Sequence, residues 1–392
     1  MNKHIFATLF FALFSTITGV GIVVPLLPVY AHSMGAAGVY IGLIFGAFSL
    51  SRTVFLPYFG RLSDRKGRKP FIIIGMLAYT LVSVAFIFCT QVMHLIAIRF
   101  FQGIASAMIM PVVQAYVGEI TPPGREGFIM GAFNMSLFFG LSMGPVLGGL
   151  LKDHLSLQST FFSMGVLSFI GFLLCLGLLP PTREEIVIHR QRPPVRWRVI
   201  LADRTIAGLF VYRLAYTAGI GVIWGFLPVL ADAELKLSSS RIGVLVMLGV
   251  LVSGLVQLPM GKLADIWHRK TMVVVGGLVA VVALLAYQRA YSFEYLFVVS
   301  VLFGLGGGTA MPALMAMAVI KGQQTESMGS VIALLTMAHS LGMLAGSLLG
   351  GLMMDWFELR IAFVLGGVGL LLGIVIFVIC TRSTTSPPVP QG

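Results

Sequence analysis

The strongest constraint on this chain is a series of long apolar segments separated by short polar connections. A bilayer core of about 30 Å needs roughly 20 apolar residues per helix. Twelve stretches meet that length: 5–31, 38–60, 71–90, 93–119, 127–151, 159–180, 205–231, 241–261, 271–288, 294–320, 328–354 and 359–381. Strands of a closed barrel would be shorter and would alternate in polarity. The sequence therefore predicts an all-α integral membrane protein with twelve transmembrane helices.

Composition narrows the functional classes. Of the 392 residues, 58% are hydrophobic and only 10% are charged, which is far from the usage of soluble domains. The net charge of +12 lies in short gaps between apolar runs and not on a basic face with interleaved aromatic residues, so we expect no nucleic-acid partner. Cys89, Cys175 and Cys380 lie inside apolar runs without CxxC spacing. We therefore expect no disulfide, no metal site and no cofactor.

The distribution of cations predicts the orientation in the membrane. With the N-terminus inside, 18 of the 26 Lys and Arg residues fall on the cytoplasmic side, five on the outer side and three within spans. Cytoplasmic loops carry this excess in membrane proteins. The first apolar run is too long for the core of a signal peptide, so it is interpreted as a retained span. We expect a multi-pass membrane protein with both termini in the cytoplasm.

The two halves of the chain repeat each other at an offset of 200 to 202 positions. Matching features include the pairs Leu27-Pro28 and Leu227-Pro228, Met110-Pro111 and Met311-Pro312, Asp153 and Asp355, and the glycines at 140, 144, 148 and 149 with those at 342, 346, 350 and 351. A collinear series predicts two pseudo-symmetric six-helix bundles related by an axis along the membrane normal, as in many carriers. The expected divisions are 1–180, a cytoplasmic linker at 181–204, a second bundle at 205–382 and a disordered tail at 383–392.

A dense basic loop, 60–70, separates the second and third spans, and a weaker copy lies at 261–270. A carboxylate near a helix N-terminus is favoured by the helix dipole, and Arg or Lys side chains can join helix ends. The plainer interpretation is that these cations only obey the positive-inside rule.

Three motifs give the chain a resemblance to the major facilitator superfamily, and within it to the twelve-span drug:proton antiporters of bacteria, the multidrug efflux group. Residues 60–69 resemble the signature between the second and third helices of that family. Residues 99–103 resemble its R-x-x-Q-G signature, and residues 140–149 resemble the antiporter motif of its exporters. The motif residues are Gly60, Asp64, Arg65, Gly67, Arg68 and Lys69; Arg99, Gln102 and Gly103; and Gly140, Gly144, Pro145, Gly148 and Gly149.

The resemblance implies a non-enzymatic, monomeric carrier that works by alternating access. The carrier would lie in a bacterial inner membrane. The resemblance also implies a gating latch that holds the outward-facing state, in which Asp64 and Arg68 bridge to Glu119 and to the eleventh span. The latch residues are Gly60, Asp64, Arg65, Gly67, Arg68, Lys69 and Glu119. Arg99 would tune a neighbouring acid during proton transfer. The glycines of 140–149 would form a tight hinge against the other half, or simply a packing surface.

The substrate is the open question. None of the 14 Asp and Glu residues lies at the centre of a predicted span, which departs from the pattern of exporters that exchange cations for protons. The candidate cavity residues are Arg52, Gln114, Asn134, Arg213, Trp224 and His339. An Arg inside a span should face a cavity or a partner, unless it reaches the headgroups. His339 is a candidate proton carrier or a packing residue.

These observations favour export of amphipathic small molecules, with protons as a candidate coupling ion. A cation–proton antiporter that uses Glu119 or His339 is the nearest rival. A carrier of an anionic or lipid-like solute without simple proton antiport, and a membrane sensor that transports nothing, remain as alternatives.

Overall fold

The computed structural model describes residues 3–122, 126–180, 202–325 and 327–382. These residues contain twelve spans long and apolar enough to cross a membrane. The first span is α1 (Lys3–Val23) with α2 (Leu26–Ser33); the others are α3 (Gly38–Lys66), α4 (Arg68–Ile87), α5 (Val92–Ile120), α6 (Glu126–His154), α7 (Leu157–Leu178), α9 (Arg204–Ala233), α10 (Ser239–Ile266), α11 (Arg269–Tyr287), α12 (Phe293–Gln324), α13 (Met328–Trp356) and α14 (Ile361–Cys380). The predicted all-α fold is confirmed. Most of the predicted linker and all of the predicted tail lie outside the described residues.

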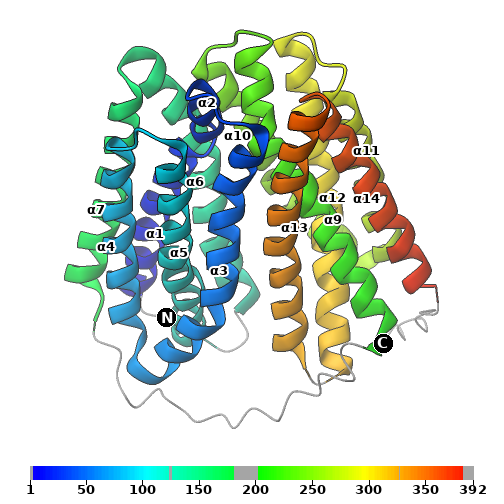
Figure 1. The fold of residues 1–392 in the computed structure, drawn as a ribbon. Coiled ribbons are helices and arrows are strands. Elements are labelled where there is room, and N and C mark those ends of the chain that lie inside the picture. The colour runs from blue at the N-terminus through cyan, green and yellow to red at the C-terminus, as the bar shows by residue number, and fades with distance from the viewer. Residues whose placement is uncertain (1–2, 123–125, 181–201, 326, 383–392) are drawn as a thin grey trace.

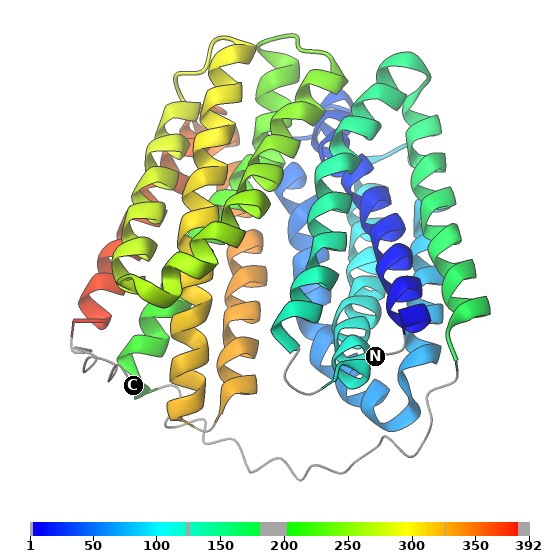
Figure 2. The ribbon, with the colours of Figure 1, turned by 180° about the vertical axis from the view of Figure 1, so that it is seen from behind.

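The helices form two bundles, α1–α7 and α9–α14, which stand side by side (Figures 1 and 2). We call the side where α1 begins and α14 ends the terminal side, and the opposite side the distal side. The bundles meet mainly through α3 against α13 and through α6 against α10. On the distal side, Gly38 and Gly42 of α3 face Gly351 and Ser347 of α13 so closely that a methyl group would collide with the backbone. In Figure 1 the ribbons of the two bundles diverge toward the terminal side.

The first predicted span is interrupted at Pro25, between α1 and α2. Proline has no N–H to donate, and its ring displaces the carbonyl four residues earlier. Val24 still donates to the Val20 carbonyl at 3.1 Å, and the helix resumes at Leu26. The apolar run alone predicted one continuous helix.

The basic loop is shorter than its sequence suggested, because α3 continues to Lys66 and α4 begins at Arg68. Gly67 alone separates them, with a φ of 86°. Residues with a Cβ rarely adopt this left-handed conformation, whereas glycine adopts it without strain. The sharp reversal brings side chains from the last turn of α3 next to those from the first turn of α4.

Candidate functional site: a central cavity and its two ends

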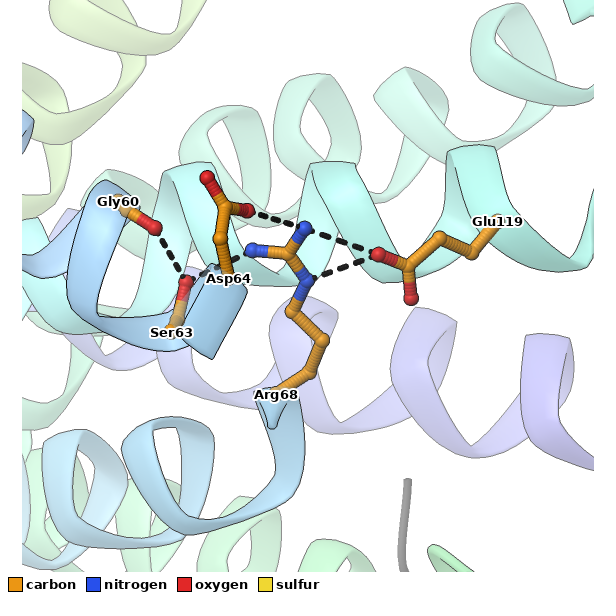
Figure 3. A network of polar contacts seen from close by, with 5 residues as sticks. All are labelled: Gly60, Ser63, Asp64, Arg68 and Glu119. Atoms are coloured by element: carbon orange, nitrogen blue, oxygen red, sulfur yellow. Dashed lines mark hydrogen bonds and ion pairs between the residues drawn. The ribbon is translucent and has the colours of Figure 1, made fainter. Parts of the chain in front are cut away.

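The reversal at Gly67 supports a charged network around Arg68 (Figure 3). Its Nη2 lies 2.5 Å from Asp64 Oδ1 and 2.9 Å from Glu119 Oε1. Its Nε donates to the same Glu119 oxygen at 3.0 Å, and its Nη1 donates to Ser63 Oγ at 2.7 Å. The Ser63 hydroxyl in turn donates to the Gly60 carbonyl at 2.8 Å. One guanidinium therefore joins the terminal ends of α3, α4 and α5.

Four of the predicted latch residues, Gly60, Asp64, Arg68 and Glu119, are thus in one network within the first bundle. Lys69 donates to the Leu179 carbonyl just after α7, whereas Arg65 is exposed. Among the described residues, the ion pair of Asp64 is with Arg68 and not with α13. The gating role of these residues stays a prediction.

The second copy of the loop reproduces only part of this arrangement. Lys270 donates to the Thr381 carbonyl after α14 at 3.2 Å, as Lys69 does after α7. The position 201 residues after Glu119 is Ile320, so the second bundle has no equivalent carboxylate. The Nε of Arg269 is buried and has no hydrogen-bond partner among the described residues. The charged network is therefore a feature of the first bundle.

Arg99 of α5 is buried and well paired within the first bundle. Its Nε donates to the Ile44 carbonyl of α3 at 3.2 Å, and its Nη1 donates to Gln102 Oε1 at 2.7 Å. Its guanidinium also lies 4.4 Å from the centre of the Phe48 ring, within the range of a cation–π interaction. A methyl group at Gly103 would collide with the Phe48 carbonyl. The R-x-x-Q-G residues thus pack α5 against α3, and no carboxylate contacts Arg99 in the described part of the chain.

The glycines of α6 face two different helices. Gly140, Gly144 and Gly148 lie against the backbone of α1 in the same bundle. Gly149 instead lies against the Ser239 carbonyl of α10, and the Pro145 carbonyl lies against Gly243 of α10. Small residues of this kind allow helix backbones to approach closely. The motif therefore packs α6 on its own bundle and closes the distal contact with the other one; its role as a hinge stays a prediction.

Two carboxylates complete the distal closure. Asp153, in the last turn of α6, accepts hydrogen bonds from the backbone N–H of Ser239 at 3.0 Å and of Ser240 at 2.8 Å. Asp355, in the last turn of α13, accepts from the N–H of Gly38 at 2.5 Å and of Val39 at 2.8 Å. Each carboxylate thus caps the first turn of a helix in the opposite bundle, where four N–H groups lack intrahelical partners.

Sequence reasoning did not predict this pair of caps. It matched Asp153 with Asp355 in the repeat, but it assigned them no role. The signal that was available is a repeated carboxylate at the end of a repeated glycine motif, on the side with few cations.

Between the bundles lies a cavity of about 700 Å³. Its wall is mostly apolar and comes from both bundles. The first contributes Arg52, Tyr79, Arg99, Asn134 and Phe138, and the second contributes Arg213, Tyr216, Trp224, Gln257, Phe303 and His339. Of the predicted cavity residues, only Gln114 is not part of this wall. The described residues of the wall include no Asp or Glu.

Two arginines on this wall differ from Arg99 in their partners. Arg52 of α3 makes no hydrogen bond or ion pair with the described residues, and its Nε is buried. Arg213 of α9 donates from Nη2 to His339 Nδ1 at 3.4 Å and from Nη1 to the Met311 sulfur, while its Nε is buried without a partner. Both contacts of Arg213 are with weak or distant acceptors.

The comparisons with known proteins agree with this architecture. The sequence profile of the Major Facilitator Superfamily matches residues 9–220 and again residues 209–392. The chain belongs to the major facilitator superfamily. The two overlapping matches together span almost the whole chain, one for each bundle.

Individual members of the superfamily are similar at low identity. An uncharacterized MFS-type transporter of Methanocaldococcus jannaschii is 27% identical over 363 residues, which are 91% of this chain and 92% of that protein. The quinolone resistance protein NorA of Staphylococcus aureus is 26% identical over 221 residues, which are 55% of this chain and 56% of NorA. The chain thus matches only about half the length of NorA.

A solved structure supports the fold. The crystal structure of a bacterial homolog to the human lysosomal transporter Spinster, in an inward-facing and occupied conformation, superimposes with a TM-score of 0.85 at 14% identity and covers 97% of both chains. The family and this structural neighbour are membrane transporters.

Proposed function

We propose that this chain is a secondary active carrier that exports amphipathic small molecules, drugs or metabolites, from a bacterial cell by alternating access. It resides in the inner membrane with both termini in the cytoplasm, so the terminal side is cytoplasmic and the distal side is external. The observation that carries the proposal is a mostly apolar cavity of about 700 Å³ between two bundles that share a distal closure. Pockets of roughly 300–1,000 Å³ accommodate drug-sized ligands.

Two further observations support export. The glycines of α6 resemble the antiporter motif, and part of the chain is similar to a protein named for quinolone resistance. Protons are the proposed coupling ion. His339 lies on the cavity wall and, among the described residues of that wall, is the only one whose side chain ordinarily has a pKa near neutral.

The test is a transport assay in proteoliposomes with an imposed pH gradient. A panel of cationic, neutral and anionic amphiphiles is loaded, and their movement is followed with the gradient present and after it is collapsed. We expect at least one compound to move in a gradient-dependent way. If nothing in the panel moves faster than in protein-free liposomes, the carrier proposal is wrong. Movement that does not depend on the pH gradient would support the carrier proposal and exclude protons as the coupling ion.

A further inference from the structure

The cavity has a chemical preference that the proposed function leaves open. Its wall contains the guanidinium groups of Arg52, Arg99 and Arg213, and the described wall contains no carboxylate to balance them. The Arg99 guanidinium donates hydrogen bonds to the Ile44 carbonyl and to Gln102, and it lies against the Phe48 ring. Arg52 has no hydrogen-bond partner among the described residues, and Arg213 has only the Met311 sulfur and the His339 nitrogen. Charged groups away from water are normally paired or fully hydrogen-bonded.

The two arginines come from opposite bundles, Arg52 from α3 and Arg213 from α9. Both line the same cavity, and Arg213 also contacts the His339 ring on its wall. A planar guanidinium presents several N–H donors in a geometry that matches an oxyanion. Arg52 donates to none of the described residues, and Arg213 donates only from Nη1 and Nη2.

The remainder of the wall suits an apolar body. Trp224, Phe138 and Phe303 line the same cavity as the two arginines. A cationic ligand would meet two uncompensated positive charges and no carboxylate, and a neutral ligand would leave both charges unbalanced.

We propose that the cavity binds an organic anion, whose oxyanion group lies between Arg52 and Arg213 while its apolar body lies against the aromatic side chains. This inference rests on the proposed carrier function and assigns its substrate class. The anion supplies the missing counter-charge for an arginine from each bundle. A carboxylate, sulfonate or phosphate ester meets the requirement.

The test is a binding measurement with three probes of similar size that differ in the charged group. They are 1-naphthylacetate, 1-naphthylacetamide and 2-(1-naphthyl)ethylammonium, titrated by calorimetry into the purified full chain in nanodiscs of zwitterionic lipid. We expect the anion to bind more tightly than the amide, and the ammonium to bind most weakly. Dodecyl phosphate forms a second arm: tight binding of this probe without the naphthyl anion assigns the site to a lipid-like phosphate.

Variants locate the effect. Arg52→Gln and Arg213→Gln should each weaken binding of the anion by roughly 10- to 100-fold, as the loss of a charge-assisted hydrogen bond does. Both should change the affinity of the amide by less than about threefold, because its group is uncharged. Arg52→Lys keeps the positive charge but lacks the planar set of N–H donors of the guanidinium. It should therefore bind the anion more tightly than Arg52→Gln and more weakly than the unmodified chain. Arg289→Gln, at an exposed arginine between α11 and α12, is the matched control and should change nothing.

Retained binding of the amide shows that a variant is folded. If neither variant folds, the order of the three probe affinities for the unmodified chain tests the proposal. Equal affinities, or tightest binding of the ammonium, would overturn the proposal. So would anion binding that is unaffected by both substitutions, or no binding of either anionic probe up to about 1 mM, the weak end of usual carrier and enzyme affinities. Transport of cations in the proteoliposome panel would also contradict the proposal of an anionic substrate while supporting the carrier proposal. The two proposals can therefore fail separately.

Discussion

The distal closure is held by two carboxylates that cap helices of the opposite bundle, and their removal should open that side. Asp153 binds the first turn of α10, and Asp355 binds the first turn of α3. Losing an N-terminal cap costs about 0.5–2 kcal/mol, and typically about 1. Both carboxylates are exposed, so we take about 1 kcal/mol for each. Since about 1.4 kcal/mol is a factor of ten in an equilibrium constant, Asp153→Ala should raise the ratio of distally open to closed molecules about fivefold.

The two caps are on separate helix pairs, so their effects should add in free energy. The double variant Asp153→Ala with Asp355→Ala should therefore raise the ratio about 25-fold, from about 2 kcal/mol in total. Asparagine caps helices about as well as aspartate but carries no charge. Asp153→Asn should consequently lose only the contribution of the helix dipole, about 0.3–1 kcal/mol, and open the closure less than alanine does.

The assay is double electron–electron resonance between spin labels on the exposed distal residues Leu155 and Tyr291, one in each bundle. Cys89, Cys175 and Cys380 are first replaced so that only the introduced cysteines react. The longer distance should gain population in the order control, Asp153→Asn, Asp153→Ala, double alanine. Asp232→Ala is the control, because Asp232 is also a carboxylate at the distal end of a helix, and it makes no cross-bundle hydrogen bond with the described residues. Distance distributions for the double variant that match the control would refute the reasoning.

Other predictions concern the packing and the coupling. Gly149→Ala should also favour the distally open state, since its methyl group would meet the Ser239 carbonyl, whereas Gly177→Ala has open space around it and should be silent in the same distance measurement. Arg99→Gln should lower the free energy of unfolding by about 1.5–3 kcal/mol, because it removes buried charge-assisted hydrogen bonds to the Ile44 carbonyl of α3 and to Gln102. Thermal unfolding in detergent measures this, and a loss no larger than that for Arg289→Gln would contradict it. His339→Gln should make transport insensitive to an imposed pH gradient while the amide probe still binds; an unchanged pH dependence would exclude His339 as the proton carrier.

The long apolar runs predicted the spans correctly because hydrocarbon thickness sets helix length. They did not predict the interruption at Pro25, because a proline alone is ambiguous. Pro111 and Pro145 lie inside helices that continue through them, whereas α1 ends just before Pro25. The difference lies in how neighbouring groups accommodate the missing N–H, and one sequence does not encode those neighbours.

The candidate site was also predicted only in part. The sequence placed Arg52, Arg99 and Arg213 within spans, but it did not predict which of them are hydrogen-bonded to other residues. Arg99 is satisfied by the Ile44 carbonyl, 55 positions away in the chain, and Arg52 meets nothing comparable. Similarly, the bond between Asp153 and Ser239 joins positions 86 apart. Such contacts depend on how the bundles pack, which the pattern of residues within each span does not determine.

The central claim is that solutes cross through the cavity only when the distal closure opens, and a reversible cross-link tests it most directly. In the background without native cysteines, Asp153→Cys and Ser240→Cys introduce two thiols at positions whose side chains already contact each other. Transport of the panel compounds is then measured in proteoliposomes after oxidation and again after reduction, with each single cysteine as a control. We predict that the oxidised double variant does not transport the panel compounds and that reduction restores transport. Transport by the single variants should be the same with and without the oxidant. Undiminished transport by fully cross-linked protein would contradict the account.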